Sequence, residues 1–198
     1  MRLVQIAGFV GSGKTGVIRE ICKGEKTDFI ANNEQSAESL RGICGHVDFF
    51  PFKSPCARIR QYSFRVEAME KNAPEVLITE SPGNCQEVSA PMLNQFYINR
   101  KDIELGPLIT VIDGRKMASG VSKRDSEGLR MYNMIDESDA VIVSFSDMLT
   151  DDEMKSIRET ISVINEDAKV FFSSPGCDLS EVKGLVFGDS KYSRPLYN

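Results

Sequence analysis

The sequence lacks any apolar run long enough to cross a membrane. No stretch approaches the ~20 apolar residues that a spanning helix needs. The first residues also lack the basic start, long apolar centre and cleavage site of a secretory leader. We therefore expect a cytoplasmic protein that binds no membrane.

Histidine and excess positive charge are also scarce. His46 is the single histidine, which argues against the Ser-His or Cys-His pairings of protease and esterase triads. The net charge of −5, with Lys and Arg scattered along the chain, argues against nucleic-acid binding. Five cysteines, an odd number in a chain without an export signal, are expected to be reduced thiols rather than disulfides.

The 198 residues suffice for one α/β domain, which we expect to span 1–198. Apolar runs that read as buried strands alternate with amphipathic helical segments, which predicts a three-layer, doubly wound, mostly parallel sheet. The predicted strands are 3–7, 28–31, 75–79, 108–112, 140–145 and 169–173. The predicted helices are 15–22, 58–71, 126–137, 151–165 and 178–187, with another that begins at Ser89. Residues 32–55 read as a long irregular loop.

The segment from Gly8 to Thr15 fits the phosphate-loop pattern G-x-x-x-x-G-K-[ST]. A predicted strand precedes it and a predicted helix follows it, which is the context that this motif requires. Its glycines allow backbone N–H groups to cradle phosphates, and the helix N-terminus adds its positive dipole end. Lys14 is expected to reach the outer phosphates, and the Thr15 hydroxyl to bind Mg²⁺. The remaining expected nucleotide contacts in this segment are Gly11, Ser12, Gly13 and Gly16.

Four segments in order carry a resemblance to a known family: IAGFVGSGKT at 6–15, FIANNE at 29–34, VLITESPG at 76–83 and LITVID at 108–113. Over roughly residues 1–175, the chain resembles the CobW/UreG/HypB family of SIMIBI-class, metallochaperone-type P-loop GTPases. That family serves cobalamin, urease and hydrogenase maturation. The resemblance implies a P-loop NTPase fold, Mg²⁺-dependent GTP hydrolysis and a homodimer around the nucleotide.

Within this resemblance, Glu80 stands where the family has a glutamate at the end of a strand. A carboxylate beside a phosphate loop can hold the Mg²⁺ shell or orient the attacking water, and the alternative is an ordinary solvated acid. The resemblance also implies that Gly83 lets the backbone approach the γ-phosphate. Glu34 is either a further Mg²⁺ ligand or a loop charge.

The element that recognises the base departs from the family pattern. Family members carry Asn-Lys-x-Asp after the fifth strand, whereas this chain has Ser144-Phe145-Ser146-Asp147. Asp147 could accept hydrogen bonds from guanine, and the ring of Phe145 could stack on the base. Without the asparagine and lysine, binding of ATP or relaxed selectivity is an alternative to GTP. Ser173 and Ser174 resemble a further base-contacting turn, although the same residues are common in ordinary loops.

Family members also carry thiols between the second and third strands. Here Cys56 stands nearest to that position, Cys85 follows Gly83, and Cys44 and His46 lie upstream. Thiolates and imidazole suit Zn²⁺, Ni²⁺ or Co²⁺, so Cys56 and Cys85 are candidate ligands that Cys44 or His46 would assist. The alternative is that these cysteines are small buried apolar residues.

Together these observations favour a small NTPase that binds GTP or ATP with Mg²⁺ and hydrolyses it slowly, with Lys14 and Glu80 as catalytic residues. Its expected role is metal-cofactor delivery or the maturation of a client metalloenzyme, including cobalamin-related maturation. One alternative is a non-enzymatic nucleotide sensor that regulates a partner. Another is a small-molecule kinase, which would need an arginine-rich lid that the sequence does not display.

Overall fold

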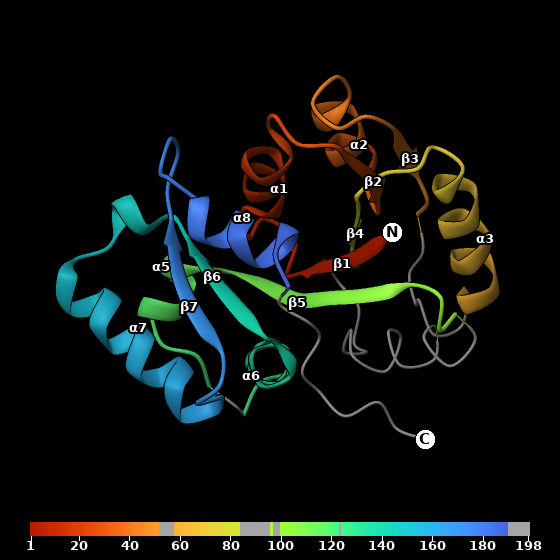
Figure 1. The fold of residues 1–198 in the computed structure, drawn as a ribbon. Coiled ribbons are helices and arrows are strands. Elements are labelled where there is room, and N and C mark those ends of the chain that lie inside the picture. The colour runs from red at the N-terminus through yellow and green to blue at the C-terminus, as the bar shows by residue number, and fades with distance from the viewer. Residues whose placement is uncertain (52–57, 84–95, 97–99, 123, 190–198) are drawn as a thin grey trace.

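The computed structural model describes residues 1–51, 58–83, 96, 100–122 and 124–189 (Figure 1). Its centre is a sheet of seven strands in the order β3-β2-β4-β1-β5-β6-β7, and every neighbouring pair is parallel. The strands are β1 (Arg2–Ala7), β2 (Thr27–Ala31), β3 (Val47–Phe49), β4 (Val76–Glu80), β5 (Glu104–Asp113), β6 (Ala140–Ser144) and β7 (Lys169–Ser173).

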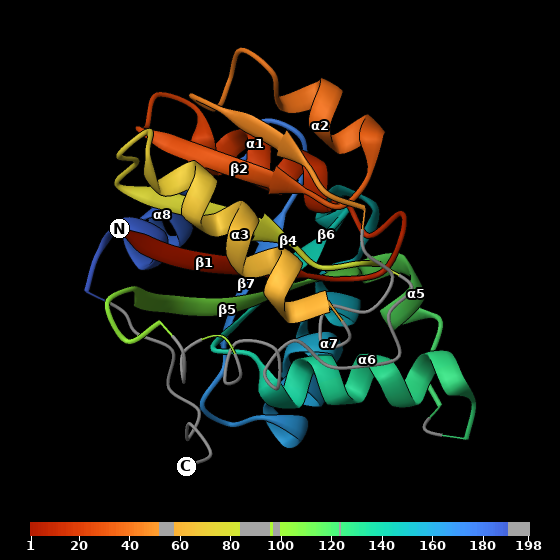
Figure 2. The same cartoon turned by 90° about the vertical axis from the view of Figure 1, so that its right-hand side faces the viewer.

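Helices cover both faces of this sheet, which confirms the expected three-layer α/β class. They are α1 (Lys14–Cys22), α2 (Glu34–Leu40), α3 (Ile59–Glu70), α5 (Gly114–Ala118), α6 (Ser126–Glu137), α7 (Asp151–Ile164) and α8 (Ser180–Phe187), with a 3₁₀ turn η2 (Ser146–Met148). Figure 2 shows the strands side by side, with α1 and α2 on one side of them and α6 on the other.

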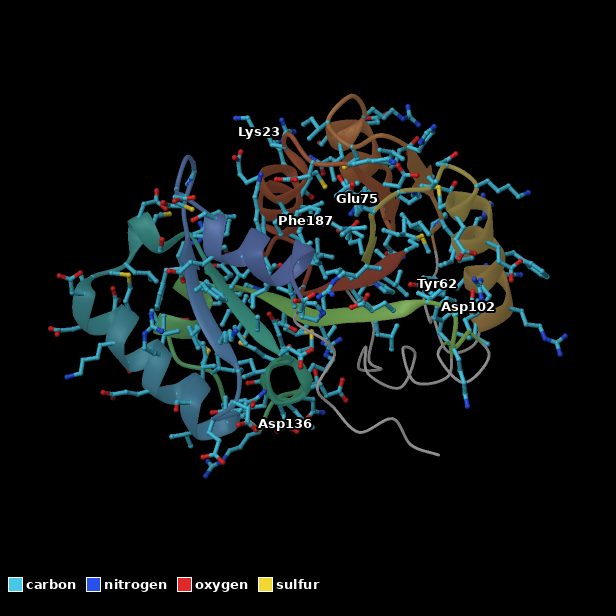
Figure 3. The ribbon with its side chains drawn as sticks, in the orientation of Figure 1. Lys23, Tyr62, Glu75, Asp102, Asp136 and Phe187 are labelled. Carbon is cyan, nitrogen blue, oxygen red and sulfur yellow. The ribbon has the colours of Figure 1, made fainter. Side chains whose placement is uncertain are left out.

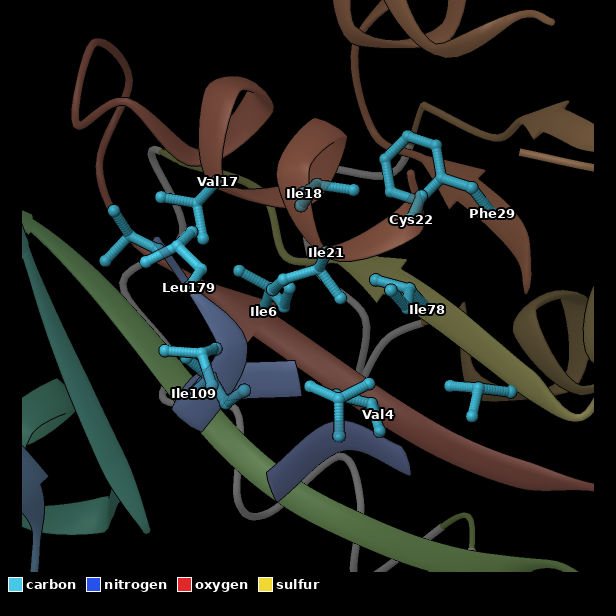
Figure 4. Close-up of a cluster of buried hydrophobic side chains, with 14 of the residues drawn as sticks. Val4, Ile6, Val17, Ile18, Ile21, Cys22, Phe29, Ile78, Ile109 and Leu179 are labelled. Carbon is cyan, nitrogen blue, oxygen red and sulfur yellow. The ribbon is translucent and has the colours of Figure 1, made fainter. Parts of the chain in front are cut away.

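One face of the sheet packs against α1, α2 and α8. Val4 and Ile6 of β1 point into this core and meet Ile18 and Ile21 of α1 (Figure 4). The spacing of the α1 residues follows the helical period, so one stripe of the helix is buried while the other faces water. This packing fixes the start of α1, and hence the phosphate loop before it, against the end of β1.

The opposite face packs against α3 at one side and against α5, α6 and α7 at the other. Leu3 and Ala7, which alternate with the residues of the first face, enter the α3 core beside Tyr62. Figure 3 labels Tyr62 on α3 and Phe187 on α8, the two helices that mark the opposite faces of the sheet. Strands buried on both faces explain the continuous apolar runs in the sequence.

Several segments differ from the sequence-based expectation, and among them the short helix α5 was not predicted. Residues 32–55, expected to be an irregular loop, contain the short elements α2 and β3. Strand β5 begins at Glu104 rather than at 108. Its pairing with β1 shifts register between Leu3 and Gln5, and this irregularity lets the strand continue through Gly106 and Pro107. The helix expected to begin at Ser89 lies outside the described residues, apart from the buried Phe96.

None of the described helices has the length and apolar content needed to span a bilayer. Because all strands are parallel, their carboxyl ends share one edge of the sheet, and in such sheets ligands bind at that edge. The phosphate loop follows β1 there, and Glu80 ends β4 there.

Candidate functional site

The phosphate loop wraps one wall of a cavity of ≈790 Å³. Gly8, Gly11 and Gly13 have φ angles of 143°, 79° and 84°, a region that residues with a Cβ rarely adopt. Gly13 is the N-cap of α1, so the first N–H groups of the helix open toward the loop. Most of the expected contacts line this cavity, whereas Gly8 is not among its lining residues. The expected contacts that line it are Gly11, Ser12, Gly13, Lys14, Thr15, Gly16, Glu34, Glu80, Gly83 and Phe145.

Lys14 lies buried under this loop, with 6% of its surface exposed. Its Nζ donates to the carbonyl oxygens of Gly8 and Phe9, both at 2.8 Å. Burial lowers the pKa of Lys14, and the nearby Glu80 carboxylate opposes that effect. An ammonium has three N–H donors, so one remains to bond a phosphate oxygen that enters the cavity.

Three side-chain oxygens form a cluster next to Lys14, which we call the oxygen cluster: Thr15 Oγ1, Ser36 Oγ and Glu80 Oε1. Ser36 Oγ lies 2.8 Å from Thr15 Oγ1 and donates to Glu80 Oε1 at 3.3 Å. Asn33 Nδ2 also donates to both carboxylate oxygens of Glu80, each at 3.3 Å, and the Asn32 N–H donates to Oε2 at 3.1 Å. Hard oxygen ligands close together are the donor set that Mg²⁺ prefers.

Burial raises the pKa of Glu80, while Lys14 and the donors from Asn32, Ser36 and Asn33 act in the opposite direction. Only 2% of Glu80 is exposed. A buried carboxyl group with a raised pKa is a stronger base than an exposed one, which suits a group that must orient or deprotonate water.

Local structure explains why these residues meet. Strand β2 pairs with β4, so the residues that follow Ala31 emerge beside the end of β4, where Glu80 lies. Asn33 then caps α2 by accepting a hydrogen bond from the Ser36 N–H at 2.8 Å. The cap turns Ser36 inward, and it is 1% exposed.

Gly83 touches the tip of the phosphate loop. Its carbonyl accepts a hydrogen bond from the Val10 N–H at 3.3 Å. A Cβ at this position would lie 2.6 Å from that nitrogen, so only glycine allows the approach. The segment after β4 is thereby bonded directly to the loop.

A second groove, ≈330 Å³, adjoins the first at Gly13. Phe145 lines it from one side, and Ser173 and Ser174 line it from the other. Ser144 Oγ donates to the carbonyls of Ser12 and Ile112 at 2.7 and 2.9 Å, which ties the end of β6 to the phosphate loop. The expected base-contacting residues therefore gather here, except that Asp147 is exposed in η2 and is not among the residues that line the groove.

The expected transition-metal ligands do not lie at this edge of the sheet in the described part of the chain. Cys44 is buried, 4% exposed, and its thiol contacts that of Cys22. This contact and burial raise the pKa of Cys44. His46 Nδ1 lies 3.4 Å from Asp28 Oδ1, just before β3 and thus at the amino ends of the strands. Cys56 and Cys85 lie outside the described residues.

Among the residues that the structure describes, no group of three or more His, Cys, Asp or Glu side chains is placed to hold a metal ion. Glu34 lines the phosphate cavity but is exposed. The cavity is instead lined by Thr15 and Glu80 of the oxygen cluster, which offer a hydroxyl and a carboxylate.

The sequence-based reasoning missed Asn32, Asn33 and Ser36, which contact Glu80. The signal was present: an asparagine N-cap, a glutamate in the first turn, and Ala37 and Leu40 at helical spacing indicate a short helix. Nothing in the sequence indicated Arg115, which reaches Phe145 only through the tertiary fold.

Comparisons with known proteins show the family and the fold of this chain. The family model described as "CobW/HypB/UreG, nucleotide-binding domain" matches residues 2–172. Zinc-regulated GTPase metalloprotein activator 1 from Schizosaccharomyces pombe is 22% identical over 210 residues, which cover 95% of this chain and 50% of the relative. The chain thus spans about half the length of this curated relative.

Solved structures share the fold. Zn(II)-bound YjiA GTPase from E. coli superimposes with a TM-score of 0.66 at 15% identity, covering 98% of this chain and 63% of that one. HypB from Helicobacter pylori, in complex with nickel, gives a TM-score of 0.61 at 18% identity and covers 92% of this chain and 83% of that one. Because the family model matches most of the chain, from Arg2 to Phe172, this protein belongs to the CobW/HypB/UreG family.

Proposed function

We propose that this chain is an NTPase that binds GTP or ATP with Mg²⁺, hydrolyses it slowly and acts in the delivery of a metal cofactor to a client metalloenzyme. The observation that carries the proposal is the buried Lys14 ammonium between the phosphate-loop carbonyls and the oxygen cluster. A buried cation with hard oxygen ligands next to it matches the two charges of a Mg²⁺–triphosphate complex, which are the negative phosphate chain and the positive metal ion.

Each residue has a distinct task in this proposal. The loop N–H groups and Lys14 hold the phosphate chain, and Gly83 brings the backbone after β4 close to its outer end. Glu80 would either accept a hydrogen bond from the attacking water and orient it, or bind Mg²⁺ beside the outer phosphate. Asn33 and Ser36 keep the Glu80 carboxylate in one position, which limits the reorganisation needed during the reaction.

Thr15 and Glu80 would hold Mg²⁺, and Ser36 would support them. The fit rests on the hydroxyl–hydroxyl distance of 2.8 Å and on the hydroxyl–carboxylate distance of 3.3 Å within the oxygen cluster. When bound there, Mg²⁺ would neutralise charge on the outer phosphates. Hydrolysis without a further cation would be slow, and no arginine from the described residues lines the cavity.

The metal-delivery part of the proposal is supported by the relatives. The fission-yeast relative is named as a zinc-regulated metalloprotein activator, and YjiA and HypB were solved with zinc and nickel. The candidate ligands for Zn²⁺, Ni²⁺ or Co²⁺ are Cys56 and Cys85, in a homodimer formed around the nucleotide. Cys44 is buried against Cys22, and His46 lies at the amino ends of the strands, so neither is proposed as an assisting ligand.

Titration calorimetry of Lys14→Ala with GTP and ATP in Mg²⁺ tests the nucleotide site. We expect at least a tenfold loss of affinity, because a hydrogen bond to a charged group contributes about 1.5–3 kcal/mol. Lys155→Ala, which removes an exposed lysine of α7, is the matched control and should bind like the parent. Unchanged affinity in Lys14→Ala would refute the site.

Phosphate release from GTP and from ATP, measured beside these affinities, separates an NTPase from a sensor that binds nucleotide without hydrolysing it.

The metal site is tested by the double variant Cys56→Ser/Cys85→Ser, which should bind zinc or nickel less tightly than the parent. Equal metal binding by the parent and the double variant would remove these cysteines from the proposal.

A further inference from the structure

Arg115 stacks on the ring of Phe145. The guanidinium carbon lies 3.9 Å from the ring centroid, which places a planar cation in contact with one face of the aromatic ring. The two residues belong to different elements, since Arg115 is the second residue of α5 and Phe145 directly follows β6. Their contact is therefore a product of the fold.

Arg115 is held in this position by the end of β5. Its Nε and one terminal nitrogen donate to the two carboxylate oxygens of Asp113 at 3.0 and 2.8 Å, a bidentate pair that fixes the plane of the guanidinium. Asp113 in turn caps α5 by accepting from the Arg115 N–H at 3.0 Å. The carboxylate is 9% exposed, so its geometry is fixed by the surrounding chain.

Phe145 is held from the other direction. Its backbone has a φ of 57°, unusual for a residue with a bulky side chain, and the preceding Ser144 is hydrogen-bonded to the phosphate loop. A Cβ placed on Gly13 would lie 3.7 Å from Cε2 of the ring, so the ring edge rests on the loop. Strained backbone that the surroundings hold in place is typical of functional positions.

Only part of the ring is covered. Phe145 lines both the phosphate cavity and the ≈330 Å³ groove, whereas Arg115 lines neither. The guanidinium therefore lies behind the ring, and the groove runs along its other side. That groove begins at Gly13 and ends at the Ser173–Gly176 turn, so its position relative to the loop is that of a group attached to the inner end of a phosphate chain.

We propose that Arg115 is a positioning residue for the nucleobase: it braces Phe145 from behind, so that the free face of the ring stacks on a purine in the groove. This inference rests on the proposed nucleotide binding. In this chain, stacking on Phe145 would replace the base contacts that family members make with the Asn-Lys pair of Asn-Lys-x-Asp. Because every purine has a π-face, stacking favours binding of both GTP and ATP rather than strict selection of guanine.

The test compares ligands with and without a base. Affinities for GTP, ATP and inorganic triphosphate, each with Mg²⁺, are measured by calorimetry for the parent, Arg115→Ala, Arg115→Lys, Phe145→Leu and the Arg115→Ala/Phe145→Leu double variant. We expect Arg115→Ala to bind both nucleotides about 3–10-fold more weakly, in keeping with a cation–π contact, and to bind inorganic triphosphate like the parent. Arg115→Lys keeps the charge but loses the planar guanidinium, so its nucleotide affinity should lie between those of the parent and of Arg115→Ala.

The double variant tests whether Arg115 affects nucleotide binding only through Phe145. If Arg115 acts through Phe145, its removal in the Phe145→Leu background should cause no further loss of nucleotide affinity. Lys116→Ala, an exposed neighbour on α5 that pairs with Glu127, is the matched control for effects on that helix. Melting temperatures of all variants report whether α5 stays folded.

Among the variants, three results would overturn the inference: unchanged nucleotide affinity in Arg115→Ala, an equal loss for inorganic triphosphate, or fully additive losses in the double variant. A parent that binds neither nucleotide nor inorganic triphosphate refutes the proposed function itself. If the parent binds all three ligands equally well, the phosphate site stands, but the proposed stacking of Phe145 on the purine is refuted.

Discussion

Lys14 and Glu80 are both removed from water, and each shifts the ionisation of the other. Burial lowers the pKa of the lysine and raises the pKa of the glutamate, and the attraction between them offsets part of both effects. Within the folded chain, the charged forms of these residues are therefore maintained at a cost to stability. Active-site groups are commonly held in this way.

Replacing Glu80 should reveal that cost. Because its pKa is higher in the folded chain than in the unfolded chain, folding favours the protonated form, and the ionised form destabilises the fold at neutral pH. The direction of the pKa already includes the attraction of Lys14. We therefore expect Glu80→Gln to melt at a higher temperature than the nucleotide-free parent at pH 7–8.

The same reasoning fixes the pH dependence. The advantage of Glu80→Gln should shrink as the pH falls through the raised pKa of Glu80 toward about 4.3, where glutamate is also protonated in the unfolded chain. Thermal melts of parent and variant from pH 8 to pH 4 measure this difference. Glu75→Gln, which replaces an exposed glutamate just before β4, serves as the control. A constant difference across this range would contradict the explanation.

At the scale of elements, the carboxyl end of β4 and the loop after β1 act as one unit. Ser81 N–H donates to Ile6 O at 3.0 Å, and Gly83 O accepts from Val10 N–H at 3.3 Å. A change in either segment is thus transmitted to the other through backbone hydrogen bonds. We therefore expect the occupancy of the phosphate cavity to affect the segment from Ser81 to Gly83.

A methyl group at Gly83 should break this connection. Its Cβ would lie 2.6 Å from Val10 N and 3.0 Å from the carbonyl carbon of Phe9, both backbone atoms that cannot move without deforming the phosphate loop. We expect Gly83→Ala to lose about tenfold or more in affinity for Mg²⁺–GTP and to be less stable than the parent, a cost of about 1–3 kcal/mol for overpacking. Calorimetry and thermal melting measure the two effects.

Gly184→Ala provides the contrast. Gly184 lies within α8, and a Cβ there would meet nothing within 4 Å. Alanine favours helix over glycine by about 0.5–1 kcal/mol, so this variant should be slightly more stable and bind nucleotide like the parent. Nucleotide affinity that is equal in the two alanine variants would show that the close approach at Gly83 is unimportant.

At the scale of the whole molecule, the two edges of the sheet have different roles. The phosphate cavity and the groove lie at the carboxyl ends of the strands. At the amino ends, buried polar side chains join neighbouring elements. Asn165, at the end of α7, donates through Nδ2 to the carbonyls of Ile135, Asp136 and Ser138 at 2.9, 3.1 and 2.8 Å.

Removing Asn165 should therefore affect stability and spare binding. In Asn165→Ala, the carbonyls at the end of α6 lose a buried donor, which should cost about 1–3 kcal/mol in the free energy of unfolding. Affinity for Mg²⁺–GTP at a temperature where the variant is folded should match the parent. Denaturant melts measure the loss of stability, and calorimetry measures the nucleotide affinity. Asn133→Ala, on the exposed side of α6, is the control. A loss of affinity without a loss of stability would contradict this separation of roles.

Much of the fold could be predicted from the sequence, because its information is local. Buried parallel strands are written as continuous apolar runs, so the strand ending at Ala7 and the helix from Ser126 to Glu137 were placed closely. Short elements carry too few residues for a period to show, so α2 and β3 were missed. The first residues of β5 were not predicted, because Gly106 and Pro107 usually interrupt a strand and only the pairing with β1 shows that the sheet accommodates them.

The sequence by itself determined the phosphate loop and the α/β class. The loop needs glycines, a lysine and a hydroxyl at fixed spacing along one short segment, and the class needs only alternating apolar strands and amphipathic helices. The tertiary structure alone decided what surrounds Glu80 and Phe145. Ser36 reaches Glu80 across 44 positions of the sequence, and Arg115 meets Phe145 from another element. No local pattern encodes such contacts, because they arise only when the parallel sheet brings the carboxyl ends of separate strands to one edge.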